Sequence, residues 1–222
     1  MQIDMRVMEL LASKICHDLV SPVSAINNGV ELIEDIGGSV VDEAMKLIGD
    51  SGTTAARRLR LFRMAYGRAG SEESLKIPDV RQVAEQYLST GKITLEWPEH
   101  LPNADLGTQR GFLKTLLNLI VLAEESLAYG GTIAIREANA GQGTGCRIEV
   151  SGRNAQLSQQ MQEALEGTAA IEALSPRTIQ AYVVGRFASQ FGLKLAHDHS
   201  VPDRLELTLN LKEEAAPLAS AS

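Results

Sequence analysis

The sequence predicts an α+β fold, in which a helical hairpin is followed by a two-layer α/β domain. Apolar residues recur at helical spacing from Met5 to about Tyr66, whereas helical and strand-like segments alternate in the second part of the chain. Between these parts the composition shifts to Gly, Ala, Ser and Glu, which indicates a linker. We therefore expect two units, residues 1–68 and 77–212, with a linker at 69–76 and a disordered tail at 213–222.

The first unit is predicted to contain two helices, each with one apolar stripe. The apolar positions step by threes and fours, the spacing of packed helices. They are Met8, Leu11, Ile15, Leu19, Ile26, Val30 and Ile33 on the first helix, and Val41, Met45, Ile48, Gly52, Ala55, Leu59, Phe62 and Tyr66 on the second. The run Ile36-Gly37-Gly38-Ser39 ends the first helix and turns the chain.

Two such helices cannot cover both stripes by themselves. A second copy of the hairpin would complete a four-helix bundle, so we expect a homodimer. The alternative is that the hairpin packs against the second unit of its own chain.

The second unit is predicted to alternate between helices and strands. Helices are expected at 79–88, 106–129 and 176–191, and strands at 93–97, 132–136, 146–151, 194–197 and 205–211. The glycine-rich loop at 141–145 would connect two of the strands as a hairpin. The result is a mixed sheet covered by helices.

Composition excludes several classes of function. The net charge of −7 argues against non-specific nucleic-acid binding, which needs a basic surface. Cys16 and Cys146 have neither metal-ligand nor disulfide spacing, which favours a reducing cytoplasm. The sequence contains no run of about 18 apolar residues, and so it predicts no membrane span.

The most informative residues are His17 and its neighbours. At about 100° per residue, His17 lies roughly 160° from both Ile15 and Leu19, so its ring should face solvent. A neutral imidazole carries a free lone pair and is a competent nucleophile near neutral pH. Asp18 can hold the ring in one tautomer and compensate the charge that develops when the other nitrogen attacks. His17 and Asp18 are therefore the candidate catalytic residues.

Pro22 lies one turn after this pair. It cannot donate the backbone hydrogen bond that the Asp18 carbonyl would normally accept, and this predicts a kink below the histidine. The alternative is a tolerated bend without a function.

A polar surface is expected around His17, where a partner protein would dock. Its candidate members are Leu10, Ser13, Lys14, Ser21, Ser24 and Asn28. On the second helix the basic run Arg57, Arg58, Arg60 and Arg63 would either meet an acidic partner or form an ordinary solvated face.

The other three histidines carry no comparable signal. His100 lies in a proline-flanked loop. His197 and His199 could share one face of a strand, but no third metal ligand is near them in the sequence, so we predict no metal site.

Together these residues resemble the sensor histidine kinases over nearly the whole chain. His17, Asp18 and Pro22 match the phosphoacceptor motif H-[DE]-[LI]-x-x-P of those kinases. The resemblance implies that the second unit has the Bergerat fold, which in the kinases binds ATP.

The second unit departs from the kinase pattern at three nucleotide motifs. Leu122 stands where the asparagine box has a magnesium ligand, and a leucine cannot coordinate a hard cation. The segment at 152–156 lacks the aspartate and later glycines of the D-x-G-x-G box, and 173–178 lacks the glycines of the phosphate lid. We therefore expect a degenerate domain that binds no ATP.

A phosphoacceptor hairpin joined to such a domain resembles the ChpT-type histidine phosphotransferases. The resemblance implies that His17 accepts a phosphoryl group from the receiver aspartate of a CckA-like hybrid histidine kinase. His17 would pass it to CtrA-like and CpdR-like response regulators in a cell-cycle phosphorelay. No cofactor is expected on this chain, because the receiver domain would bring the Mg²⁺. Ser21 replaces the Thr, Asn or Gln of kinases with phosphatase activity, so phosphatase activity should be weak.

Three alternatives remain open at this point. The chain could be a kinase with an unusual ATP site, a scaffold that binds receivers without transfer, or a dimerisation module with a degenerate partner domain.

Overall fold

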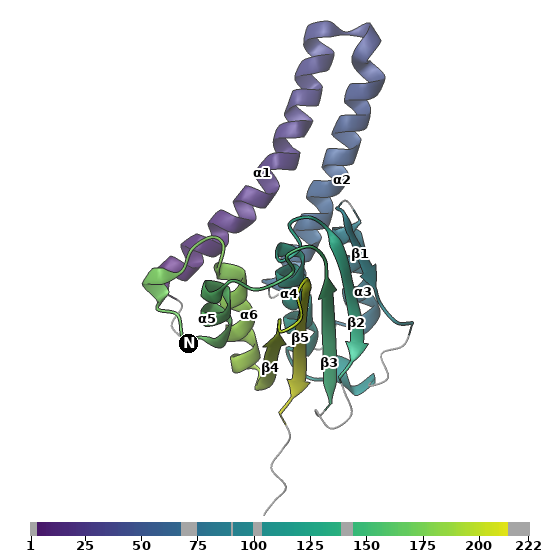
Figure 1. The fold of residues 1–222 in the computed structure, drawn as a ribbon. Helices are drawn as coiled ribbons and strands as arrows, with labels where there is room; N and C mark the ends of the chain where they lie inside the picture. The colour runs from purple at the N-terminus through teal and green to yellow at the C-terminus, as the bar shows by residue number, and fades with distance from the viewer. Residues whose placement is uncertain (1–3, 68–74, 90, 100–103, 139–143, 213–222) are drawn as a thin grey trace, which may run out of the picture.

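The computed structural model describes residues 4–67, 75–89, 91–99, 104–138 and 144–212. Figure 1 shows a long helical hairpin that projects from an α/β domain, which confirms the predicted α+β architecture. Most of the predicted linker and the predicted C-terminal tail lie outside the described residues, as does His100.

The hairpin consists of α1 (Met5–Ile36) and α2 (Val41–Ala65), joined by the short 3-10 turn η1 (Gly38–Val40). Gly37 and Gly38 have φ values of 63° and 22°, a region that favours glycine, and so the chain reverses at the predicted place. Asp4 caps α1 by accepting a hydrogen bond from the backbone N–H of Arg6 at 2.8 Å. Figure 1 shows that α1 bends near its middle, the part of the helix that contains Pro22.

The predicted apolar stripes are only partly buried in the single chain, where Ala55 and Phe62 are enclosed. Met8, Val30, Met45 and Leu59 are exposed, although each belongs to a predicted stripe. The inner seam also contains small or atypical residues, which carry little apolar signal. Outside the predicted stripes these are Pro22 and Gly29 on α1 and Ala44 and Ser51 on α2, and Ala55 of the predicted stripe is buried with them. Both helices therefore have a second apolar row that faces away from the seam.

The base of the hairpin packs on the α/β domain of its own chain. Val7, Leu10, Ile15 and Leu19 of α1 contact its core, and an Arg6 guanidinium N–H donates to the Leu174 carbonyl at 3.0 Å. The base of the hairpin therefore packs against the second unit of its own chain, which was the alternative to dimerisation. The upper part of the hairpin extends away from the domain (Figure 1).

The α/β domain contains a five-stranded mixed sheet in the order β1-β2-β3-β5-β4. Its elements are α3 (Ile77–Leu88), β1 (Ile93–Glu96), η2 (Ala104–Gly107), α4 (Phe112–Glu125), β2 (Gly131–Glu137), β3 (Gly145–Ser151), α5 (Gln159–Glu166), η3 (Ile171–Ala173), α6 (Ile179–Gln190), β4 (Leu193–Asp198) and β5 (Arg204–Leu211). Strands β1 and β2 pair in parallel, and the other neighbours are antiparallel. The predicted hairpin between β2 and β3 is confirmed.

The two faces of the sheet differ in chemistry. Helices α3, α4 and α6 cover one face, where the alternate apolar residues of the strands enter the core. The opposite face carries cross-strand ion pairs, such as Arg136 with Glu96 at 2.5 Å and Arg147 with Glu206 at 3.6 Å. The helices therefore occupy a single layer, as the two-layer prediction requires.

Two helix predictions differ from the structure. The helix expected at 106–129 is shorter, because Gly111 adopts φ 74° and α4 begins only at Phe112. Helix α5 was not predicted at all, and the helix expected at 176–191 begins at Ile179.

Gly111 provides a test of this corner of the fold. A Cβ at Gly111 would overlap the ring of Phe191 in addition to straining a left-handed backbone. Gly111→Ala is therefore expected to lower the free energy of unfolding by about 2–4 kcal/mol, measured by urea denaturation. Gly192→Ala is the matched control, since Gly192 has φ 67° but no atom near its added Cβ, and should cost only about 1–2 kcal/mol. Equal losses in the two variants would exclude the overlap with Phe191.

Candidate functional site

His17 projects from the middle of α1 into solvent. Its side chain is 89% exposed, as the helical periodicity predicts. The ring atom Nδ1 lies 3.3 Å from Oδ1 of Asp18, at the long end of hydrogen-bond range. A proton on Nδ1 would face this carboxylate and leave Nε2 with a free lone pair toward solvent.

Asp18 is held by groups on both helices. Pro22 leaves the Asp18 carbonyl without its usual helical donor, and a guanidinium N–H of Arg58 on α2 donates to that carbonyl instead. Arg58 therefore connects Asp18 to the second helix at the position where Pro22 interrupts the helical hydrogen bonding of α1. The sequence indicated the missing donor but not the arginine that replaces it.

The structure contradicts the prediction that Lys14 belongs to the exposed docking face. The Lys14 side chain is only 12% exposed. Its ammonium forms an ion pair with Glu125 at the end of α4 and lies 3.7 Å from Oδ2 of Asp18. Lys14 turns inward because the carboxylate of α4 lies beside the base of α1, an arrangement that depends on tertiary packing.

A cluster of ionisable side chains surrounds Lys14. Burial lowers the pKa of Lys14, but Glu125, Asp18 and Glu124 more than offset this, so its pKa lies above its ordinary value. Burial raises the pKa values of both Glu124 and Glu125, and Lys14 partly counters the rise. Burial and the Glu124 charge likewise raise the pKa of Tyr87. No pattern in the sequence indicates this cluster, because its members come from three helices.

The prediction of an exposed surface is wrong for Leu10, which packs against the core of the α/β domain, and holds for other candidates on α1. Ser21, Ser24 and Asn28 all face solvent. Arg57 differs, since it donates to the Ser89 hydroxyl at 2.8 Å and thereby connects α2 to the end of α3. Arg60 similarly donates to Gln86 of α3 at 2.8 Å. Part of the basic run thus contacts the chain's own domain.

The asparagine of the kinase-like box has a structural role here. Asn118 is fully buried, and its amide N–H groups donate to the carbonyls of Ala65 and Lys114 at 2.9 Å. Gln180 of α6 donates to the Asn118 carbonyl, and Tyr66 donates to Gln180 at 2.6 Å. This network fixes the end of α2 against α4 and α6.

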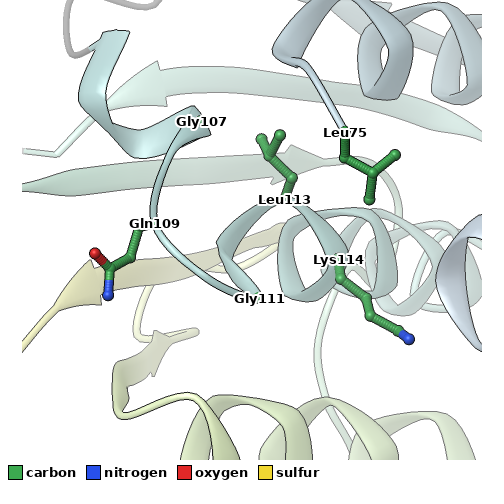
Figure 2. A pocket seen from close by; sticks show the side chains of 6 residues that line it. All are labelled: Leu75, Gly107, Gln109, Gly111, Leu113 and Lys114. Carbon is green, nitrogen blue, oxygen red and sulfur yellow. The ribbon is translucent and has the colours of Figure 1, made fainter. Parts of the chain in front are cut away.

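The positions of the other kinase-like motifs are filled differently. Leu122 is completely buried in the core, and the Arg153 guanidinium lies 4.5 Å from the ring centre of Tyr129 on the surface. Figure 2 shows a hollow at the start of α4, lined by Leu75, Gly107, Gln109, Gly111, Leu113 and Lys114. Its volume is about 10 Å³, so it holds at most one water molecule.

The two described histidines outside α1 lie together. The rings of His197 and His199 stack with centres 5.8 Å apart, and Nε2 of His197 contacts Glu166 of α5 at 3.0 Å. Within the described ranges, no three His, Cys, Asp or Glu residues are arranged to hold a metal. No helix in the described part of the chain is long and apolar enough to cross a membrane.

The fold and the exposed imidazole place the chain in the class of histidine phosphotransfer proteins. A family model described as the histidine phosphotransferase C-terminal domain matches residues 77–202. The protein phosphotransferase ChpT of Brucella abortus (strain 2308) is 32% identical over 188 residues, which cover 84% of this chain and 87% of that protein. The chain therefore belongs to the ChpT-type histidine phosphotransferase family.

The structure of a bacterial phosphotransferase agrees with this assignment. A bacterial phosphotransferase determined at 1.7 Å superposes with a TM-score of 0.75 and 28% identity, covering 95% of this chain and 98% of that one. The Acinetobacter baumannii histidine kinase AdeS is more distant, with a TM-score of 0.39 and 12% identity over 87% and 95% of the two chains.

Proposed function

We propose that His17 carries a phosphoryl group between the receiver aspartates of a multistep phosphorelay. The observation that carries this proposal is the exposed His17 ring, with Asp18 at Nδ1, in a chain of the histidine phosphotransferase family. Both residues are on α1, and an approaching receiver meets small polar side chains such as Ser21 and Ser24 near the ring, together with the exposed Val20.

The transfer step follows from the geometry of the pair. The lone pair on Nε2 of neutral His17 attacks the phosphorus of the aspartyl phosphate, and the bond from phosphorus to the aspartate oxygen breaks. The receiver aspartate leaves as a carboxylate, and the imidazole becomes positively charged while Nδ1 keeps its proton. Asp18 stabilises that charge. A second receiver aspartate then attacks the phosphohistidine and reverses these changes.

The receiver domain would supply the remaining chemistry. Phosphoryl transfer needs cationic stabilisation of the equatorial oxygens, and we expect the Mg²⁺ to be part of the acidic receiver site. By family resemblance, the donor would be a CckA-like hybrid kinase and the acceptors CtrA-like and CpdR-like regulators. Because acyl phosphate and phosphohistidine are both energy-rich, transfer should run in either direction.

Incubation with a radiolabelled receiver tests the proposed function. The wild-type chain should acquire label that survives alkali and is lost in acid, the behaviour of phosphohistidine. Subsequent addition of an unlabelled receiver should remove that label. A chain that binds phosphorylated receivers but acquires no label would be a scaffold, and the proposal would fail.

The exposed apolar rows support a homodimer built from two hairpins. At about 100° per residue, Met5, Met8, Val23 and Val30 lie along one side of α1. Met45, Gly49, Gly52, Ala56 and Leu59 form the corresponding row on α2. Because the two helices are antiparallel, both rows belong to one face of the hairpin. This face would bury itself in a four-helix bundle while His17 stays outside.

We further propose that the α/β domain is a degenerate Bergerat domain without ATP binding. The buried Leu122 and the missing glycines around Arg153 support this. Isothermal titration with a non-hydrolysable ATP analogue and Mg²⁺ should give no binding heat. Micromolar affinity would contradict the prediction and favour a kinase.

A further inference from the structure

Lys14 connects the α/β domain to the phosphoacceptor pair. Its ammonium lies between two carboxylates, one from Glu125 of α4 and the other from Asp18 of α1. The two oxygens of Asp18 are therefore shared between different partners. Oδ2 faces Lys14 at 3.7 Å, whereas Oδ1 faces Nδ1 of His17 at 3.3 Å.

The charges around Asp18 explain why a cation is needed at this place. Glu124 and Glu125 are both near Asp18 and are shielded from solvent, so the three carboxylates repel one another. Arg58 is the other nearby cation, but it donates to the backbone carbonyl of Asp18. Without Lys14, the Asp18 carboxylate would face two like charges and turn toward solvent.

We infer that Lys14, anchored by Glu125, is a positioning residue that holds the Asp18 carboxylate against Nδ1 of His17. The inference rests on the proposed phosphoacceptor role of His17. It also gives the second domain a part in the reaction, because Glu125 belongs to α4 of that domain. A domain without a nucleotide site would still complete the phosphotransfer site.

The chemical consequence is control of the imidazole tautomer. With Asp18 in place, the proton stays on Nδ1, and Nε2 keeps the lone pair that attacks phosphorus. The same carboxylate compensates the charge of the ring after transfer. If Asp18 moves away, both tautomers become populated and the transition state loses its countercharge.

Lys14→Met tests the inference, with Lys46→Met as the matched control on the exposed side of α2. Lys14→Met should slow transfer from a labelled receiver to His17 by at least about tenfold. The ¹⁵N NMR shifts of the His17 ring should show a smaller Nδ1–H population. Lys46→Met should change neither measurement, and Lys14→Arg should restore most of the rate, because it keeps a cation between Asp18 and Glu125.

A double variant separates positioning from folding. Lys14→Met alone leaves Glu125 buried without its cation, which destabilises the junction. Lys14→Met with Glu125→Gln removes both charges, so it should recover thermal stability while transfer stays slow. Recovery of the rate in the double variant, or unchanged transfer in Lys14→Met, would overturn the inference. Neither result would affect the proposed function, which depends on label reaching His17 in the wild type.

Discussion

Replacing His17 by alanine is expected to reduce phosphoryl transfer between receivers by at least about a thousandfold, to the level without protein. The reason is that alanine has no nucleophilic atom. Asp18 cannot substitute for the ring, because its carboxylate is partly enclosed by Lys14 and lies below the exposed face. Rapid quench of a labelled receiver with each variant, followed by separation of the two proteins, measures the rate directly.

The control for this experiment is His199→Ala. His199 is also exposed, but it lies beyond β4 and next to α5, away from the hairpin. Its removal should leave the rate unchanged, and circular dichroism should show that both variants keep the wild-type helix content. If His17→Ala still passed label to a second receiver, another residue would carry the phosphoryl group and the proposed function would be wrong.

Local pattern was sufficient to predict much of the hairpin and of the sheet. The glycines at 37 and 38 end α1 where the sequence predicts, because few other residues adopt their backbone angles. The five strands appear within one or two residues of their predicted bounds, since alternation is a local property. The orientation of His17 also follows from local helical geometry.

The errors arise where tertiary contacts decide the outcome. Lys14 looks like a surface lysine until α4 brings Glu125 beside it. The inner seam was misassigned because Gly29, Ala44 and Ser51 allow close helix approach without an apolar signal, and an added Cβ at Gly29 would lie 2.7 Å from Ile48. Helix α5 is too short to show a clear periodic pattern, and it packs against α6, a contact that no local pattern indicates.

The exposed part of the predicted apolar stripes bears on how the chain could assemble. Predicted stripe residues such as Met8 and Leu59 are exposed in the single chain and available to a second hairpin. Each helix can then pack on two sides, once within the chain and once across a two-fold axis. His17 lies on neither side, so receivers would reach it in the monomer and in the dimer alike.

Leu59→Glu is therefore expected to convert the proposed dimer into a monomer. Leu59 is 54% exposed in the single chain, and in a four-helix bundle its side chain would be buried. The substitution places one unpaired carboxylate per subunit in that interface, and symmetry doubles the penalty to at least about 4 kcal/mol, roughly a thousandfold in dissociation constant. Light scattering or sedimentation over a range of concentrations measures the change.

Leu47→Glu provides the matched control on the same helix. Leu47 is 37% exposed and lies about 120° from Leu59 around α2, outside the row that faces the second hairpin. Its replacement should leave the dimer intact. Because His17, Asp18, Lys14 and Glu125 all belong to one chain, the Leu59→Glu monomer should still accept label at a rate close to that of the wild type. Loss of transfer on dissociation would mean that the partner chain completes the site, and an unchanged dimer would place the two-fold interface elsewhere.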